Sequence, residues 1–212
     1  MQEWAEGFAV VARTRVLRRL MLVAAVVSLA QGAFVVLFVL FVVRRLGASE
    51  ADVGVLRGVQ AAGSIAAGLL LASVIRHFDP GRLLALSLGS MSALSLLIWN
   101  GPDVTTALGV YVALFVAVGV PALTTVTSLL TIVQSHAPEA VRGRVMSTLY
   151  AVLGGMQAAG MMIAGFAGTG AALTVMLNVQ AGLYLAGALL ARGLAARAAP
   201  RVAARATVEL GA

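Results

Sequence analysis

The chain has 212 residues, of which 61% are hydrophobic and only 11% are charged, and its formal net charge is +7. A water-soluble domain carries about a quarter charged residues, so this composition excludes both a disordered chain and a single water-soluble globular core. The absence of cysteine excludes a disulfide framework, a thiolate metal site and a cysteine nucleophile. All 15 basic residues are arginines. In so apolar a chain, arginines that flank membrane spans explain the charge better than a nucleic-acid partner does.

Gaps between charged residues predict an all-α membrane protein, since about 20 apolar residues suffice for one spanning helix. Residues 1–19 mix apolar and basic residues and are predicted to lie on the inner membrane surface as an amphipathic lead-in. A six-helix bundle is predicted over 20–194, with spans at approximately 20–43, 53–75, 83–99, 104–133, 145–167 and 171–191. The fourth span contains Pro121, and we interpret it as one long, kinked or tilted helix. Residues 195–212 are predicted to form a cytoplasmic tail.

The distribution of arginine predicts how the spans are oriented. Six spans place both termini on one side of the membrane, and twelve arginines fall on that side. The opposite side has three, namely Arg44, Arg45 and Arg57. Because positively charged loops stay in the cytoplasm, both termini are expected to be cytoplasmic in the inner cell membrane. The spans also form two sets of three, which we interpret as two inverted three-helix repeats, a common plan in transporters.

Three segments carry a resemblance to a known family. They read "EWAEGFAVVARTRVLRRLMLVAAV" (3–26), "AAGSIAAGLLLASVIRHFDPGRLLALSLG" (61–89) and "APEAVRGRVMSTLYAVLGGMQAAGMMIAG" (137–165). Over roughly residues 1–195 the chain resembles the C-terminal six-helix half of a major facilitator superfamily transporter of the multidrug and siderophore-export type. The resemblance implies half of a major facilitator fold that works with a second six-helix half, as a homodimer or with a complementing chain.

The resemblance also implies a cytoplasmic gate in two loops. Its residues would be Arg76, Asp79, Arg82, Glu139, Arg142 and Arg144. The loop 76–82 departs from the family's order, in which an acidic residue directly precedes an arginine. Glu139 is expected to pair with Arg142 or Arg144 at helical spacing. The alternative is that these charges only mark the topology.

Small residues at every fourth position predict close helix packing in lipid. One stripe in the second span includes Gly58 and Ala62, and one in the fifth includes Gly160 and Ala164. In the resembled family the corresponding helices border the other half, so these four residues are predicted to pack against it. The alternative is packing within this bundle.

Uncharged polar residues inside the spans predict a cavity, because each needs hydrogen-bond partners away from lipid. The predicted substrate pathway consists of Gln31, Phe34, Gln60, Thr124, Thr127 and Gln157. Hydrogen bonding between helices is the alternative role, and threonines can also bond to their own backbone. All eight carboxylates fall in loops or tails, so no span supplies an evident proton carrier.

Arg57 is the one charged residue inside a predicted span. We expect its side chain to snorkel to the outer surface. Alternatively, it attracts an anionic group of a substrate or pairs with Asp52.

These observations favour a transporter over an enzyme, with no cofactor and no metal, because no phosphate loop, metal-ligand cluster or paired carboxylates occur. The expected function is movement of a small apolar or amphipathic solute by alternating access together with a second six-helix bundle, and the resemblance to exporters implies efflux. The alternative is a non-transporting membrane fragment, or an interaction or regulatory protein embedded in the membrane.

Overall fold

In a computed structural model that describes residues 11–75, 78–167 and 173–195, the described chain is helical and contains no strand. Helices satisfy every backbone polar group within one segment, as lipid requires. The long helices are α2 (Arg15–Leu40), α3 (Glu50–Ile75), α4 (Pro80–Asn100), α5 (Leu108–His136), α6 (Arg142–Ala167) and α7 (Leu173–Ala195). A π-helical turn, η1 (Phe41–Arg45), extends α2, and the 3-10 turns η2 (Gly101–Asp103) and η3 (Glu139–Val141) precede α5 and α6.

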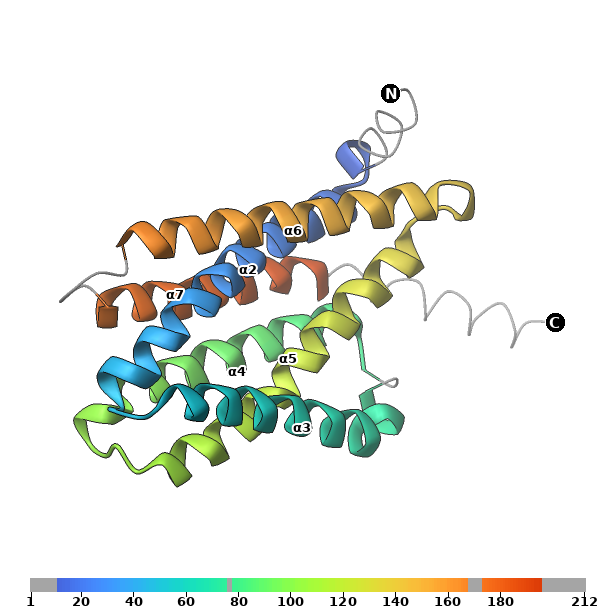
Figure 1. Cartoon of the computed structure of the whole chain (residues 1–212). Helices are drawn as coiled ribbons and strands as arrows, with labels where there is room; N and C mark the ends of the chain where they lie inside the picture. The colour runs from blue at the N-terminus through green and yellow to red at the C-terminus, as the bar shows by residue number, and fades with distance from the viewer. Residues whose placement is uncertain (1–10, 76–77, 168–172, 196–212) are drawn as a thin grey trace.

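Successive long helices run in opposite directions along the bundle (Figure 1). α2 begins and α7 ends at the same end, which also holds the α3–α4 and α5–α6 connections. We call this the arginine-rich end, because Arg15, Arg82, Arg142 and Arg192 lie in the first or last turns of helices there. The turns η1 and η2 lie at the opposite end.

The helices associate in a regular set of pairs. α2 packs along α6, α3 along α5, and α4 along α7. Two further contacts, α2 with α7 and α4 with α5, join these pairs into one bundle. Contacts between α2 and α3 and between α5 and α6 are few, although each of these pairs is consecutive in the chain.

Two of these pairs approach so closely that backbones touch. A Cβ atom added to Gly32 on α2 would collide with the carbonyl of Gln157 on α6. Likewise, a Cβ atom added to Gly160 on α6 would collide with the carbonyl of Leu29 on α2. The α3–α5 pair has the same arrangement at Gly63 and Gly119. Without a hydrophobic driving force between helices in lipid, such close packing supplies much of the attraction.

Aromatic side chains fill the bundle near the opposite end. Phe38, Phe41, Trp99, Tyr111 and Phe115 are each at most 1% exposed. The ring of Phe41 lies 4.8 Å from that of Trp99, and the ring of Phe38 lies 5.1 Å from that of Phe115, measured between centroids. Tilted and edge-on aromatic pairs at this spacing add to the energy of burial.

Pro121 lies inside α5 without ending it. The helix runs unbroken for 29 residues, which agrees with the interpretation of 104–133 as one long helix. Beyond the proline, the hydroxyls of Thr124 and Thr127 donate to the carbonyls of Val120 and Leu123.

Five helical segments of the described chain are long and apolar enough to cross a membrane. They contain α2, α4, α5, α6 and α7. α3, whose described side chains end at Leu69, is not among them, and Glu50 and Asp52 lie in its first turn. The first ten residues of the lead-in and residues 196–212 of the tail lie outside the described residues.

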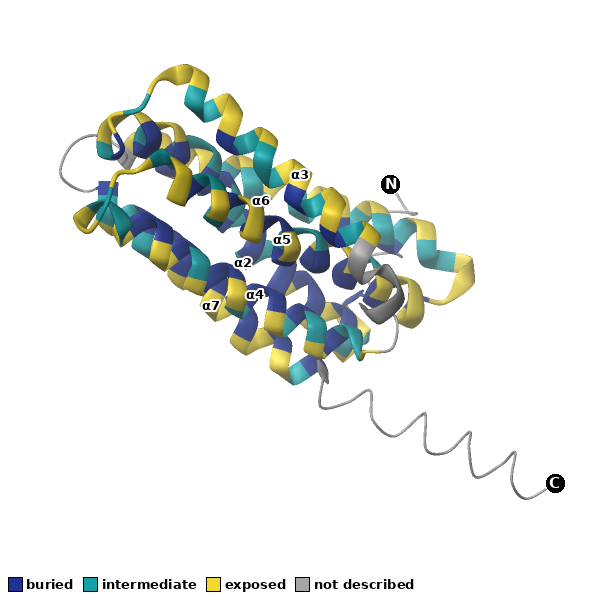
Figure 2. Cartoon of the chain, turned by 90° about the horizontal axis from the view of Figure 1, so that it is seen from below, coloured by how far each residue is buried: buried dark blue, intermediate teal, exposed yellow. Residues whose placement is uncertain are grey.

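Exposure differs strongly between helices. In Figure 2, the described part of α3 is mostly yellow and teal, whereas dark blue recurs along α2, in which 12 of 26 residues are buried. In the described part of α3 only Leu56, Gly63 and Ala67 are buried. α6 likewise turns most of its side chains outward. The two helices therefore present the least covered surfaces of the bundle.

Candidate functional site

A cavity of about 340 Å³ lies among all six long helices. Its apolar walls come mainly from α5 and α6, through residues such as Leu129, Leu130, Leu149 and Leu153. Its polar groups include Ser28, Thr125 and three glutamines. An apolar hollow with a few polar groups is typical of small-molecule sites.

The three glutamines are the ones predicted from the sequence: Gln31 on α2, Gln60 on α3 and Gln157 on α6. Three helices that are far apart in the chain thus bring amide side chains to one hollow. Sequence reasoning found them because a glutamine in a membrane span needs a polar environment.

The two predicted threonines lie outside the lining of this cavity. Thr124 and Thr127 bond to their own helix backbone and do not line the cavity, whereas Thr125 does. The Thr125 hydroxyl lies 2.9 Å from that of Ser87 on α4. Adjacent helical residues point about 100° apart, and α5 is apolar around most of its circumference, so the sequence did not show which threonine faces inward.

A second hollow of about 10 Å³, roughly the space of one water molecule, is lined by Trp99. We call it the extension, because it shares Gln31, Gln60, Met91 and Tyr184 with the cavity. Phe34, also predicted for the pathway, lines this extension and is 6% exposed. The Trp99 indole N–H donates to Gln180 Oε1 across 3.0 Å, and the Tyr184 hydroxyl donates to Gln31 Oε1 across 2.8 Å. Tyr184 belongs to both hollows. A single tyrosine in an apolar helix gave no sequence signal for this role.

Arg57 does not snorkel outward. Its guanidinium carbon lies 4.6 Å from the centre of the Phe34 ring and 5.0 Å from that of Phe38, so the side chain turns in toward α2. Nor does it pair with Asp52, whose carboxylate accepts hydrogen bonds from Ser49. The attraction of a cation to aromatic faces, which the sequence pattern does not show, explains the difference.

The predicted gate residues take separate positions at the arginine-rich end. Arg76 lies outside the described residues. Asp79 caps α4, since its Oδ2 accepts from the Arg82 N–H at 2.8 Å and Pro80 follows at the first helical position. The Arg82 side chain is exposed.

The second gate segment surrounds the turn η3. Glu139 is exposed, and no ion pair of Glu139 is found within the described part of the chain. Arg142 is half-buried, with its Nε shielded from solvent. Arg144 is half-buried, and its backbone carbonyl accepts from the Thr148 hydroxyl.

The two stripes of small residues that were predicted to face a partner bundle differ in exposure. Gly58 and Ala62 are exposed, with open space beside Gly58, so they do lie on an outer face. For Gly160 and Ala164 the prediction is wrong: both are buried inside the bundle, and Gly160 packs against α2. Close contact between α2 and α6 needs small residues, which explains the stripe without a second bundle.

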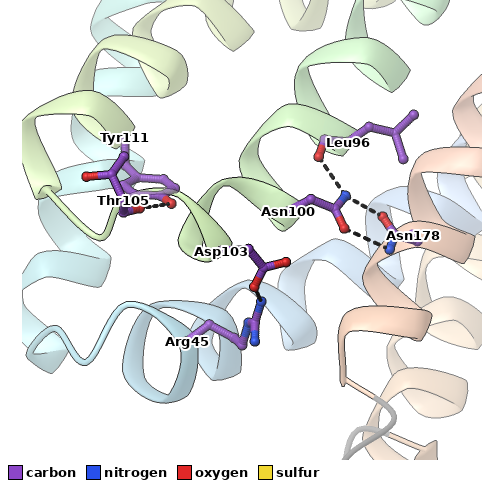
Figure 3. A network of polar contacts seen from close by, with 7 residues as sticks. All are labelled: Arg45, Leu96, Asn100, Asp103, Thr105, Tyr111 and Asn178. Atoms are coloured by element: carbon purple, nitrogen blue, oxygen red, sulfur yellow. Dashed lines mark hydrogen bonds and ion pairs between the residues drawn. The ribbon is translucent and has the colours of Figure 1, made fainter.

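Polar contacts tie helices together at the opposite end (Figure 3). Arg45 Nη2 lies 2.7 Å from Asp103 Oδ1, and this ion pair joins η1 to η2. Asn100 and Asn178 donate to each other at 2.9 and 3.3 Å, which joins α4 to α7. These contacts connect the two halves of the chain away from the arginine-rich end.

A helical bundle in which five described helical segments are long and apolar enough to cross a membrane defines a multi-pass membrane protein. The chain matches the model of a family over residues 2–208, and that family is described as transmembrane secretion effector. The chain therefore belongs to this family, which is of the major facilitator type. No curated protein and no solved structure matches it.

Proposed function

We propose that the chain moves a small apolar or amphipathic solute outward across the inner cell membrane, by alternating access together with a second six-helix bundle. The observation that carries this proposal is the cavity of about 340 Å³ at the centre of the bundle. Its volume lies in the range of small-molecule sites, about 300–1,000 Å³. Mostly apolar walls with a few amide and hydroxyl groups suit an amphipathic solute.

The pairing of helices supports two inverted repeats, α2–α3–α4 and α5–α6–α7. The two repeats relate α2 to α5, α3 to α6 and α4 to α7. Under this correspondence, the contact of α2 with α6 matches that of α5 with α3, and the contact of α2 with α7 matches that of α5 with α4. Both matching contacts exist, and the close approaches at Gly32 and Gly119 correspond in the same way. Inverted repeats are a common basis of alternating access, with the substrate between them near the midplane.

The outer faces of α3 and α6 support a second bundle. Exposed positions there are rich in small residues: Gly54, Gly58, Ala61, Ala62 and Ala66 on α3, and Ala151, Gly154, Gly155 and Ala158 on α6. Small residues allow helices of a neighbouring bundle to approach closely. Single cysteines at Ala62 and Ala151, in a chain without native cysteine, should cross-link to a second bundle in membranes. A detergent complex with the mass of one chain, together with no such capture, would contradict this part of the proposal.

We further propose that α3 is the sixth crossing and that both chain ends are cytoplasmic. The arginine-rich end would then face anionic cytoplasmic lipid, as positively charged flanks do. Tags fused to the two ends, read by accessibility in intact cells and in inverted vesicles, should give the same side for both. Tags on opposite faces would overturn the count.

Transport is best tested by closing the cavity. In proteoliposomes, the chain with its second bundle should move one or more members of a panel of amphipathic dyes. Leu153→Trp should abolish this flux, because the indole would fill the space that Leu153 borders. Leu189→Trp is the matched control, because Leu189 is 54% exposed on the outer face of α7. Flux that survives Leu153→Trp contradicts the cavity as pathway, and absence of any flux favours a non-transporting role.

A further inference from the structure

Arg57 is a half-buried charge two turns from the start of α3, and no carboxylate pairs with it within the described part of the chain. It is the one charged residue inside the spans predicted from the sequence. Its guanidinium rests over the faces of Phe34 and Phe38, at 4.6 and 5.0 Å. A charge at membrane depth is costly, and it usually marks the path of a substrate or an ion.

Of the described carboxylates at the same end, Glu50 is exposed, and Asp52 and Asp103 are already engaged. Asp52 accepts from both the N–H and the hydroxyl of Ser49, and Asp103 pairs with Arg45. Within the described residues, no hydrogen bond or ion pair to Arg57 is found. Aromatic faces attract the cation, but a guanidinium has five N–H donors, and these remain available to an anion.

Arg57 adjoins the cavity through its neighbours. Gln60, one helical turn further along α3, lines both the main cavity and its narrow extension. Phe34, beneath the guanidinium, lines the extension, where Gln31 and Tyr184 also lie. Arg57 itself lines neither hollow, but its positive charge lies beside the extension, whose lining supplies amide groups and apolar walls.

We propose that the cavity takes an amphipathic organic anion, whose apolar body lies among the leucines of α5 and α6 and whose anionic group binds Arg57 with help from the amide of Gln60. This inference names the substrate class of the site proposed above and therefore rests on the proposed function. A carboxylate of a free solute and the phosphate of an anionic lipid share the required chemistry. The experiment below separates them.

Trp99 provides a reporter, because its indole lines the extension and its ring centroid lies 6.0 Å from that of Phe34. Trp4→Phe removes the other tryptophan of the chain. In nanodiscs of zwitterionic phosphatidylcholine, quenching of Trp99 is titrated with 6-bromo-2-naphthoate and with its neutral methyl ester. Each probe partitions into lipid equally for all variants, so comparing variants for one probe isolates the contribution of Arg57.

Arg57→Gln should weaken naphthoate binding about tenfold or more and leave ester binding within about twofold. Arg57→Lys should retain part of the preference for the anion. Arg44→Gln, which removes an exposed arginine outside the cavity, is the matched control and should change neither probe. In the unaltered chain, 2-naphthalenesulfonate should compete with naphthoate and neutral 2-naphthamide should compete far less, which tests the inference even if Arg57→Gln does not fold.

If Arg57→Gln binds both probes as tightly as the unaltered chain, the anion inference is overturned while the solute cavity stands. If neither probe quenches Trp99 in the unaltered chain, the cavity itself fails as a binding site, and the proposed function falls with the inference. Phosphatidylglycerol is then added to the disc. If it lowers naphthoate affinity in the unaltered chain but not in Arg57→Gln, the anion site is supported and lipid phosphate is its occupant. Affinity that is unchanged by phosphatidylglycerol supports a free solute.

Discussion

The hydroxyl of Tyr184 on α7 donates a hydrogen bond to the side-chain oxygen of Gln31 on α2, across 2.8 Å, where the two helices border the cavity. Tyr184 is 2% exposed, so its hydroxyl is shielded from solvent. The bond therefore fixes how Gln31 is presented to the cavity.

Tyr184→Phe should lower the free energy of unfolding by about 0.5–2 kcal/mol, because Gln31 Oε1 loses its donor in a water-poor interior. Thermal unfolding of the detergent-solubilised chain measures the change. Tyr150→Phe is the control, because Tyr150 also lines the cavity but is 57% exposed. Equal effects of the two substitutions would mean that the hydrogen bond contributes nothing.

The contact between Gly32 and Gln157 leaves no space for a side chain. Gly32→Ala should push α2 away from α6 and destabilise the bundle by about 1–3 kcal/mol, the cost of overpacking. Gly155→Ala on α6 has open space and should be neutral or stabilising, because alanine is the better helix former. Thermal unfolding of both variants gives the comparison, and a harmless Gly32→Ala would show that the helices separate freely.

The α3–α5 pair should respond in the same way. Gly63→Ala would meet the backbone of Val116, whereas Gly58→Ala, on the open face of α3, meets nothing within 4 Å. We expect a loss of about 1–3 kcal/mol for Gly63→Ala and none for Gly58→Ala. Combined with Gly32→Ala, the two losses should add to within about 0.5 kcal/mol, because the glycines lie on different helix pairs. Strong non-additivity in the unfolding data would mean that the pairs move as one unit.

Ala164 and Ala62 test which small-residue face serves the bundle itself. Ala164 is 1% exposed, so Ala164→Leu should destabilise the isolated chain by about 1–3 kcal/mol. Ala62 is exposed, so Ala62→Leu should leave the unfolding temperature unchanged but weaken association with a second bundle. Unfolding in detergent and the yield of the Ala151→Cys cross-link measure the two effects. A destabilising Ala62→Leu with full cross-linking would reverse the assignment.

The pKa of the Asp52 carboxyl lies below its ordinary value of 3.8, because the Ser49 hydroxyl and the Ser49 backbone N–H both donate to it. A carboxyl with a lowered folded pKa stabilises the fold above its unfolded pKa, and that stabilisation is lost as the pH falls through the lowered value. The start of α3 should therefore loosen only below about pH 4. Ser49→Ala should raise the pKa toward 3.8 in a carboxyl NMR titration, whereas Ser147→Ala should not change it. An unchanged pKa of Asp52 in Ser49→Ala would exclude the Ser49 hydroxyl as a cause.

Much of the helical plan could be predicted from the sequence. Charge gaps predicted a helix at 83–99, and α4 covers those residues; the same argument kept α5 continuous through Pro121. The glutamine amides of the cavity were also predictable, because an amide is costly in lipid wherever the helix places it. Family membership agrees with the resemblance of the quoted segments.

The orientation of each helix about its axis was decided only by the tertiary structure. A membrane helix is apolar on nearly every side, so its sequence does not mark which side meets protein and which meets lipid. The sequence therefore did not show that Gly160 and Ala164 face the interior of the bundle. Nor did it show that Thr125, rather than Thr124 or Thr127, lines the cavity, or that Arg57 lies over the Phe34 ring. Composition determined that the chain forms helices suited to lipid. The rotation of those helices was decided by backbone contacts at glycines such as Gly32 and Gly63, and the position of the Arg57 side chain by its attraction to the rings of Phe34 and Phe38.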